Sequence, residues 1–107
     1  MPLDLSPLYT PFQLGPLTLK NRFVLPGMER QWCEDSCPPP KLGAYYRACV
    51  EGGVGLVITE SCAMDHTWAT QVPMFTRINA ETAEAWAGIV AEVKAAGGPM
   101  LMQRSPG

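Results

Sequence analysis

The spacing of hydrophobic positions changes several times along the chain, and each change predicts a new structural element. Residues 12–20, with the sequence FQLGPLTLK, place apolar residues on both sides of Gly15-Pro16, a dipeptide typical of turns, and predict a small hairpin. An apolar run at residues 23–25 then stops at a Pro-Gly pair, as expected of a short buried strand that ends in a loop. The polar stretch that follows, up to Pro40, is rich in turn formers and predicts a long loop.

Two segments show the spacing of an amphipathic helix. The first begins at Lys41 after a proline run and ends before Gly52-Gly53, which gives it both boundary signals. The second lies between Asn79, a residue suited to cap a helix, and Gly97-Gly98. We therefore expect two helices that each bury one face. The apolar positions of these faces are Leu42, Tyr45, Tyr46, Cys49 and Val50 in the first helix, and Trp86, Ile89, Val90 and Val93 in the second.

Two further apolar runs, residues 54–59 and 99–103, predict strands that follow the two helices. The first run is rich in branched residues, as expected of a strand covered on both faces in a parallel sheet. With a second loop at residues 61–78, the order hairpin, β, α, β, α, β indicates an α/β fold with parallel strands and right-handed crossovers. Three such strands leave apolar faces and unpaired edges, so we expect residues 1–107 to form a single, incomplete domain.

Composition and charge narrow the range of functions. The chain is 47% hydrophobic and 17% charged, which is typical of a globular domain. Its formal net charge of −2 and its scattered basic residues provide no surface suited to nucleic acid. The sequence has no apolar run of the roughly 20 residues that cross a membrane, and its N-terminus lacks the features of a secretory signal. We therefore expect a cytoplasmic protein whose four cysteines are reduced.

The residues most suited to chemistry lie where the predicted strands end. In parallel α/β folds the carboxyl ends of the strands meet at one rim, and ligands bind there. This rim would offer backbone amides, a hydroxyl, a carboxamide and a thioether, a set that suits a flat polar heterocycle better than a metal ion. The strand-end residues are Pro26, Gly27, Met28 and Glu29 after the first strand, Glu60, Ser61 and Cys62 after the second, and Gln103 after the third.

The same segments resemble a known family. The stretches LYTPFQLGPLTLKNRFVLPGM, YYRACVEGGVGLVITE and AGGPMLMQ, in this order and spacing, are similar to the N-terminal part of the Old Yellow Enzyme family of NADH:flavin oxidoreductases. The resemblance covers about residues 8–103 and implies the N-terminal portion of an FMN-binding TIM (β/α)8 barrel. Residues 8–20 would then form the hairpin that caps the bottom of the barrel, and residues 21–103 its first β/α units.

The resemblance also implies flavin contacts at the strand ends. Pro26, Gly27 and Met28 match the segment of the family that lines the flavin ring. Ser61 matches the small residue beside the carbonyl edge of the isoalloxazine. Gln103 matches the amide side chain that hydrogen-bonds the pyrimidine part of the ring.

Glu29 departs from the family pattern, because many members place a Thr or Cys that tunes the flavin potential at this position. An ionised carboxylate near the flavin would disfavour the anionic reduced form and so lower the reduction potential. On this hypothesis, a Glu29→Gln variant of the complete enzyme has a higher flavin potential.

The reaction of the family adds further expectations. NAD(P)H reduces FMN, and hydride then passes to a small-molecule acceptor such as an activated alkene; the flavin supplies the chemistry and the protein orients it. The catalytic residues and phosphate-binding loops of the family have no counterpart in residues 1–107, and the tail 104–107 (RSPG) departs from the usual motif. We therefore expect no catalytic residue in this chain and little FMN affinity for the chain alone.

Two other interpretations stay open. One is a structural module that uses its exposed sheet edge to pair with a separately encoded remainder of the barrel. The other is a small zinc-binding domain, although the spacing of its ligands is looser than in most zinc sites. The residues that would bind zinc are Cys33, Cys37, Cys62 and His66.

Several residues of types that often carry chemistry are interpreted as structural. Tyr45 and Tyr46 lie on the apolar face of the first predicted helix, so we expect them to pack in the core. Cys49 is expected to be buried on the same face. Glu60 is interpreted as a hydrogen-bond acceptor at the end of a strand.

Overall fold

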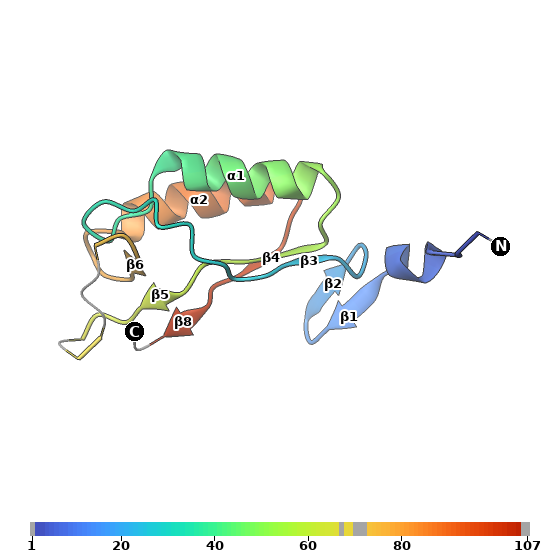
Figure 1. Ribbon diagram of the computed structural model, residues 1–107, viewed down its shortest axis with the longest axis horizontal. Coiled ribbons are helices and arrows are strands. Elements are labelled where there is room, and N and C mark those ends of the chain that lie inside the picture. Colours follow the sequence, from blue (N-terminus) through green and yellow to red (C-terminus); the bar gives the residue numbers. More distant parts are fainter. Residues whose placement is uncertain (1, 67, 70–72, 106–107) are drawn as a thin grey trace.

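The centre of the structure is a parallel sheet of three short strands, in the spatial order β3 (Val24–Leu25), β4 (Leu56–Ile58) and β7 (Met100–Leu101) (Figure 1). The computed structural model describes residues 2–66, 68–69 and 73–105. β4 lies between β3 and β7 and pairs with both in parallel. The predicted α/β arrangement is confirmed, and the sheet does not close into a barrel within the described residues.

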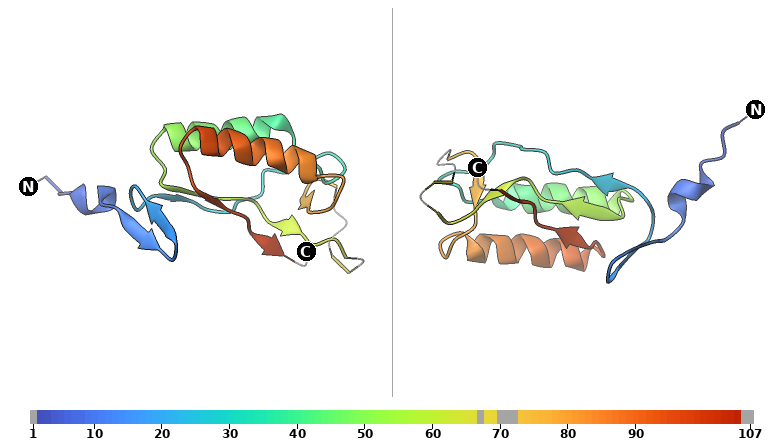
Figure 2. Two further views of the ribbon diagram at one scale, coloured as in Figure 1. Left: turned by 180° about the vertical axis from the view of Figure 1, so that it is seen from behind. Right: turned by 90° about the horizontal axis from the view of Figure 1, so that it is seen from below.

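Two helices, α1 (Pro40–Glu51) and α2 (Ala83–Ala95), cover one face of this sheet (Figure 2). Because successive side chains of a strand point to opposite faces, only alternate strand residues reach the helices. Leu25, Val57 and Met100 pack against the helices. The buried residues that the two helices contribute to this core are Leu42, Tyr46, Val50, Trp86, Ile89 and Val93.

The other face of the sheet is apolar and lies open. A hollow on this side is lined by strand residues and by residues of the N-terminal hairpin. The side chains of Val24 and Leu101 are 44% and 41% exposed there. The apolar strand face that the sequence predicts is therefore present. The residues that line the hollow are Phe12, Leu14, Leu19, Arg22, Val24, Leu56, Ile58 and Leu101.

The boundaries of the helices follow from local chemistry. α1 begins at Pro40, where the missing N–H of proline costs no helical hydrogen bond. α2 begins later than predicted, because Asn79 caps a turn that precedes the helix: its Oδ1 accepts hydrogen bonds from the N–H groups of Glu81 and Thr82. The expectation that Asn79 caps the helix itself is wrong. Across the described residues, neither helix has the length and apolar character that crossing a membrane requires.

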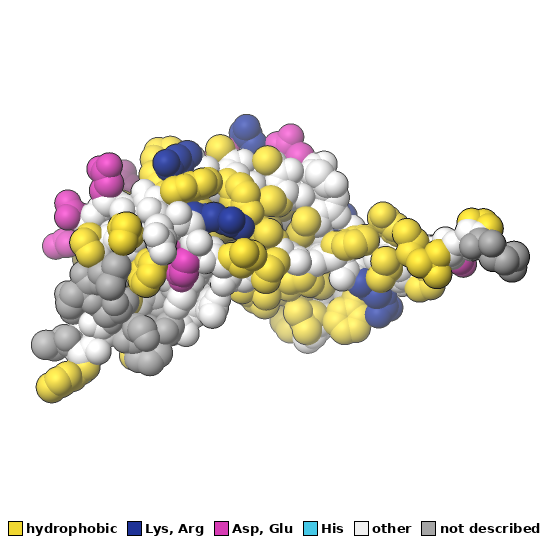
Figure 3. Space-filling view, in the orientation of Figure 1, with side chains coloured by type: hydrophobic (Ala, Val, Ile, Leu, Met, Phe, Trp, Pro, Cys, Tyr) yellow, Lys and Arg dark blue, Asp and Glu magenta, His cyan; other side chains and the backbone are white. Residues whose placement is uncertain are grey.

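The N-terminal segment forms an arm that extends away from the α/β layers (Figure 1). It consists of a short 3-10 helix, η1 (Ser6–Tyr9), and the predicted hairpin, β1 (Phe12–Leu14) and β2 (Leu17–Leu19). Gly15 has a φ of +55° in the turn, a conformation that favours glycine. Hydrophobic side chains lie along this arm (Figure 3). Those that are exposed are Leu3, Leu5, Leu8, Tyr9, Phe12 and Leu14.

A second small parallel sheet follows the carboxyl ends of the central strands. Its order is β6 (Thr76–Arg77), β5 (Cys62–Ala63) and β8 (Arg104–Ser105). The stretch 61–78, expected to be a loop, therefore contains two short strands, and its residues 67 and 70–72 lie outside the described residues. The first half of the tail 104–107 extends this sheet, and its residues 106–107 are not described.

Candidate functional site

The carboxyl ends of β3, β4 and β7 meet, and Gly27, Thr59 and Gln103 lie at the point of contact. A Cβ atom added to Gly27 would lie 2.0 Å from Gln103 Oε1 and 2.6 Å from the Thr59 carbonyl oxygen. Both distances are shorter than real Cβ contacts, so only glycine fits here without a shift of its neighbours. Gly27 and Gln103, two of the predicted site residues, are therefore direct neighbours.

Hydrogen bonds fix the backbone at this point of contact. Gln103 N donates to Thr59 Oγ1 at 3.1 Å, and Thr59 N donates to the Leu101 carbonyl oxygen at 2.9 Å. Cys62 N donates to the Gln103 carbonyl oxygen at 2.8 Å. The side-chain amide of Gln103 makes no hydrogen bond to any described residue and stays available. Thr59 is a site residue that was not predicted; its signal in the sequence is a hydroxyl at the end of an apolar run, and in the structure it is fully buried.

Glu29 and Ser61, two further predicted site residues, are joined by a hydrogen bond. Ser61 N donates to Glu29 Oε1 at 2.8 Å, so the carboxylate reaches from the loop after β3 to the end of β4. The Ser61 carbonyl oxygen accepts a hydrogen bond from Thr76 Oγ1 at 3.3 Å. The backbone of Ser61 is thus held on both sides.

Glu60 forms a second bridge between the same two segments. Arg30 N donates to Glu60 Oε2 at 2.6 Å, which agrees with the prediction that Glu60 is a strand-end acceptor. Glu60 N donates to Tyr46 Oη at 3.0 Å. Burial raises the pKa of Glu60, and the hydrogen bond from Arg30 N partly opposes this rise. The Glu29 carboxyl beside it raises the pKa of Glu60 further.

Tyr46 lies in the core as predicted, but its hydroxyl also belongs to this network. The side chain is 2% exposed, and burial raises the pKa of its phenol, which therefore stays protonated at neutral pH. The sequence pattern predicted the packing of the ring. It did not predict the hydrogen bond, because Tyr46 and Glu60 are far apart along the chain.

A stack of aromatic and cationic side chains supports the loop after β3. The Arg30 guanidinium donates to Tyr45 Oη at 2.5 Å and lies 4.5 Å from the centroid of the Tyr45 ring. The Trp32 ring meets Tyr45 edge-on at 5.8 Å, and Lys41 Nζ lies 4.8 Å from the Trp32 centroid. These contacts attach the loop to α1.

The remaining predicted site residues, Pro26 and Met28, lie on the open side of the rim. Both are exposed, and the exposed fraction of Met28 is 53%. Met28 N donates to the Pro26 carbonyl oxygen at 3.0 Å, which forms a tight turn around Gly27. The rim therefore combines an exposed apolar surface with the free amide of Gln103.

The zinc interpretation finds no support in the described residues. No group of three or more His, Cys, Asp or Glu residues among them is placed to hold a metal ion. Burial raises the pKa of Cys33 to about 12, and Cys62 is fully buried in β5. His66 is exposed, and its Nδ1 accepts a hydrogen bond from Trp68 N at 3.1 Å. Cys49 is half-buried on α1 rather than buried as expected.

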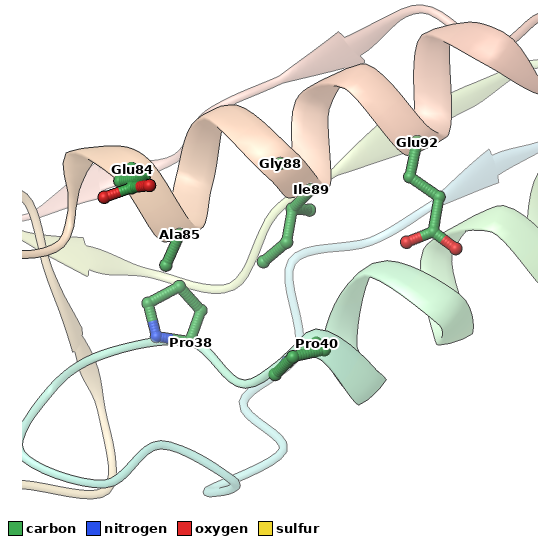
Figure 4. Close-up of a pocket in the computed structure, with 7 residues that line it drawn as sticks. All are labelled: Pro38, Pro40, Glu84, Ala85, Gly88, Ile89 and Glu92. Atoms are coloured by element: carbon green, nitrogen blue, oxygen red, sulfur yellow. The ribbon is translucent and has the colours of Figure 1, made fainter.

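A groove on the helical side lies apart from the strand ends. Ala85 and Ile89 of α2 point towards Pro38 and Pro40 across it (Figure 4). Of its two acidic residues, Glu92 is paired with Arg47 of α1, with Glu92 Oε2 and Arg47 Nη1 3.1 Å apart. The groove is mainly apolar and offers little chemistry.

Comparison with known proteins points to one family. A model of the NADH:flavin oxidoreductase / NADH oxidase family matches residues 7–106. The putative 12-oxophytodienoate reductase-like protein 2A of Arabidopsis thaliana is 33% identical over 97 residues, which cover 91% of this chain and 36% of that protein.

Two solved structures extend the comparison to the fold. The Old Yellow Enzyme from Pichia sp. AKU4542 matches with a TM-score of 0.82 and 28% identity, over 92% of this chain and 26% of that one. Morphinone reductase, solved in complex with tetrahydroNAD, matches with a TM-score of 0.78 and 33% identity, over 91% of this chain and 26% of that one. The described fold therefore corresponds to part of a TIM barrel. The chain spans about a quarter to just over a third of the length of these relatives.

Proposed function

The chain belongs to the NADH:flavin oxidoreductase / NADH oxidase family, and from this premise we propose that its strand ends contact the ring of an FMN cofactor in a hydride-transfer enzyme. When bound, FMN would accept hydride from NAD(P)H and pass it to a small-molecule acceptor such as an activated alkene. The names of two relatives, a 12-oxophytodienoate reductase-like protein and a morphinone reductase bound to tetrahydroNAD, support this choice of reductant and acceptor class.

The observation that carries the proposal is the close approach of Gly27 and Gln103. The absence of a side chain at Gly27 lets Gln103 lie directly over the backbone of the neighbouring strand end, where its amide oxygen is within 2.0 Å of an added Cβ. The amide offers both a donor and an acceptor, which suits the alternating carbonyl and N–H groups at the pyrimidine edge of a flavin. The residues present therefore fit the ring of the cofactor.

The other rim residues would complete the contact with the ring. Pro26 and Met28 provide an exposed apolar surface against which a flat ring can pack. Ser61 is held in place through its backbone, which leaves its hydroxyl to approach the carbonyl edge of the ring. Thr59 and Glu29 would act as positioning residues, because their hydrogen bonds fix Gln103 and Ser61 and do not themselves point to a ligand.

We also propose that the open face of the sheet is covered by the remaining strands of a barrel. A (β/α)8 barrel fills its interior with the side chains of eight strands, and the central sheet of the described residues has three, β3, β4 and β7. The alternation of strand residues supports this proposal, because Val24, Ile58 and Leu101 present apolar side chains on the face that the helices do not cover. Such a surface is the usual lining of a barrel core.

A chimera tests the proposed function. Residues 7–106 replace the matched segment of the Old Yellow Enzyme from Pichia sp. AKU4542, and the chimera is assayed for flavin absorbance and for NAD(P)H oxidation with a cyclic enone. We expect a yellow protein whose flavin is bleached by NAD(P)H and reoxidised by the enone. A chimera that folds, as judged by circular dichroism, but carries no flavin would contradict the proposal.

A further inference from the structure

Two glutamates cross-connect the loop after β3 with the end of β4. The Glu29 carboxylate accepts a hydrogen bond from the backbone N–H of Ser61, the residue that follows Glu60. In return, the Glu60 carboxylate accepts one from the N–H of Arg30, the residue that follows Glu29. The nitrogen-to-oxygen distances of these two hydrogen bonds are 2.8 and 2.6 Å. We call this reciprocal arrangement the glutamate clamp.

One oxygen of each carboxyl group in the clamp has no donor. Glu29 Oε2 and Glu60 Oε1 are buried, and neither has a hydrogen-bond partner among the described residues. Glu60 as a whole is only 1% exposed, so its carboxyl group is shielded from bulk water. The described residues place neither glutamate in an ion pair. Arg30 Nη2 donates to Tyr45 Oη, and Arg30 Nε is buried without a partner among the described residues. A buried carboxylate oxygen without a donor is costly, and two of them in one place require an explanation.

A single proton removes this difficulty. The two reciprocal hydrogen bonds bring the carboxyl groups of Glu29 and Glu60 together between the same two loops, and a carboxylate can only accept. If one carboxyl group is protonated, it donates to the other, and both orphaned oxygens gain a partner. Without that proton, two negative charges would lie side by side in a buried place, which favours the protonated form of Glu60.

The charges around the clamp oppose the proton only weakly. Arg30 is the cation nearest in sequence, and its charge lowers the pKa of Glu60 less than the hydrogen bond from its own N–H does, and less than burial and Glu29 raise it. The other titratable groups that face the clamp come from the loop after β3, from α1 and from β5. Burial raises the pKa of each, so that they are uncharged at neutral pH. They are Cys33, Tyr46 and Cys62.

We propose that Glu60 keeps its proton at neutral pH and donates it to the Glu29 carboxylate, and that this hydrogen bond holds together the two strand ends that carry Gly27 and Ser61. The pair then has one negative charge rather than two. As the pH rises and the proton leaves, the two carboxylates repel each other and the clamp loosens. This inference is independent of flavin binding, because every contact in it belongs to the chain itself.

The direct test follows the carboxyl groups of the unmodified chain. The side-chain carboxyl carbons of Glu29, Glu60 and the exposed Glu81 are observed by NMR in residues 1–107 from about pH 3 to about pH 9, without flavin. We expect Glu60 to retain its proton above the ordinary range of glutamate, about pH 4.3. If Glu60 releases its proton in step with the exposed Glu81, the proposal is wrong.

A pair of variants tests the consequence for stability. The folded chain holds a proton that the unfolded chain has released, so the free energy of unfolding falls as the pH rises above the ordinary range of glutamate. Within this window we expect the unfolding equilibrium constant of the parent chain to rise by up to about tenfold per pH unit. In Glu29→Gln, the glutamine amide donates to Glu60 in place of the proton, and this dependence should disappear. Glu81→Gln, on an exposed turn, should keep it.

The Glu29→Gln variant and the NMR titration can each decide whether the proposal holds. A Glu29→Gln chain that keeps the pH dependence of the parent would overturn the proposal that the Glu60 proton is donated to Glu29. If Glu29→Gln does not fold, the NMR titration of the parent chain decides alone, because it needs no substitution. Neither outcome depends on whether the chain binds FMN, so the clamp and the proposed function fail separately.

Discussion

Replacement of Gly27 by alanine should destabilise the chain, because the structure leaves no room for a side chain at the meeting point of the strand ends. The added Cβ would lie 2.0 Å from Gln103 Oε1 and 2.6 Å from the Thr59 carbonyl oxygen. The amide of Gln103 can rotate away. The Thr59 carbonyl cannot, because Thr59 is fully buried and its N–H is bonded to Leu101. The loop around Gly27 must therefore move away from β4.

The expected loss follows from this forced movement. Overpacking of a well-fitted contact costs about 1–3 kcal/mol. Replacing glycine by alanine also restricts the unfolded chain, which stabilises the folded state by about 0.4–1 kcal/mol and so reduces the loss of stability without reversing it. For a domain of this size, each kcal/mol lowers the midpoint of thermal unfolding by about 4–8 °C. We therefore expect Gly27→Ala to melt several degrees below the parent chain.

A second glycine provides the matched control. Gly88 lies on the exposed side of α2, and an added Cβ would meet no atom within 4 Å. Because alanine is the better helix former, Gly88→Ala should stabilise the chain by up to about 1 kcal/mol. Urea unfolding of both variants, followed by circular dichroism, compares the two substitutions directly. If Gly27→Ala is as stable as the parent while Gly88→Ala behaves as expected, the strand ends do not meet as described.

Three further predictions concern the network, a thiol and the cofactor. Tyr46→Phe removes the acceptor of the Glu60 N–H and should lower the free energy of unfolding by about 1–3 kcal/mol in urea, whereas Tyr9→Phe on the exposed arm should have almost no effect. Burial raises the pKa of Cys33 to about 12, so the stability that its buried thiol contributes should be lost as the pH rises from about 8.5 towards that value. At about pH 8, iodoacetamide should leave Cys33 unmodified in the folded chain, and rapid alkylation would contradict its burial. Residues 1–107 alone should bind FMN more weakly than about 1 μM in a fluorescence titration, since a tighter Kd would require about −8 kcal/mol from contacts with the ring.

The main elements of the fold could be predicted because each leaves a periodic signal. The apolar stripe from Leu42 to Val50 and the stripe from Trp86 to Val93 mark the two helices, and both stripes face the core. The hairpin follows from Gly15, whose positive φ the turn requires. Parallel order follows from the alternation of strands and helices.

The small second sheet could not be predicted, because strands of two residues are too short to show a period. Cys62 and Ala63 pair with residues on both sides only because the central strands bring them together. The start of α2 was missed for a related reason. Thr82 Oγ1 donates to the Arg77 carbonyl oxygen at 2.6 Å, and this bond holds the turn before the helix. The capping residue Asn79 gives no indication of this contact in the sequence.

The residues of the candidate site could likewise be predicted only in part. The strand-end rule and the family resemblance together selected Gly27 and Gln103, which the structure places in contact. They also selected Glu29, but as a lone carboxylate beside a flavin. In the structure its carboxyl group accepts a hydrogen bond from the N–H of Ser61, and this depends on how far a side chain reaches between two loops. The effect of Glu29 on the flavin potential stays a prediction.

The central claim is that the strand ends of this chain contact the flavin ring, and the FMN affinity of matched chimera variants tests it most directly. Gln103→Ala removes an amide at the rim, and Gln13→Ala removes an amide on the hairpin, where it bonds only to hairpin atoms. We expect the Kd of FMN to rise about tenfold for Gln103→Ala and to stay unchanged for Gln13→Ala. An equal Kd in both variants would contradict the claim.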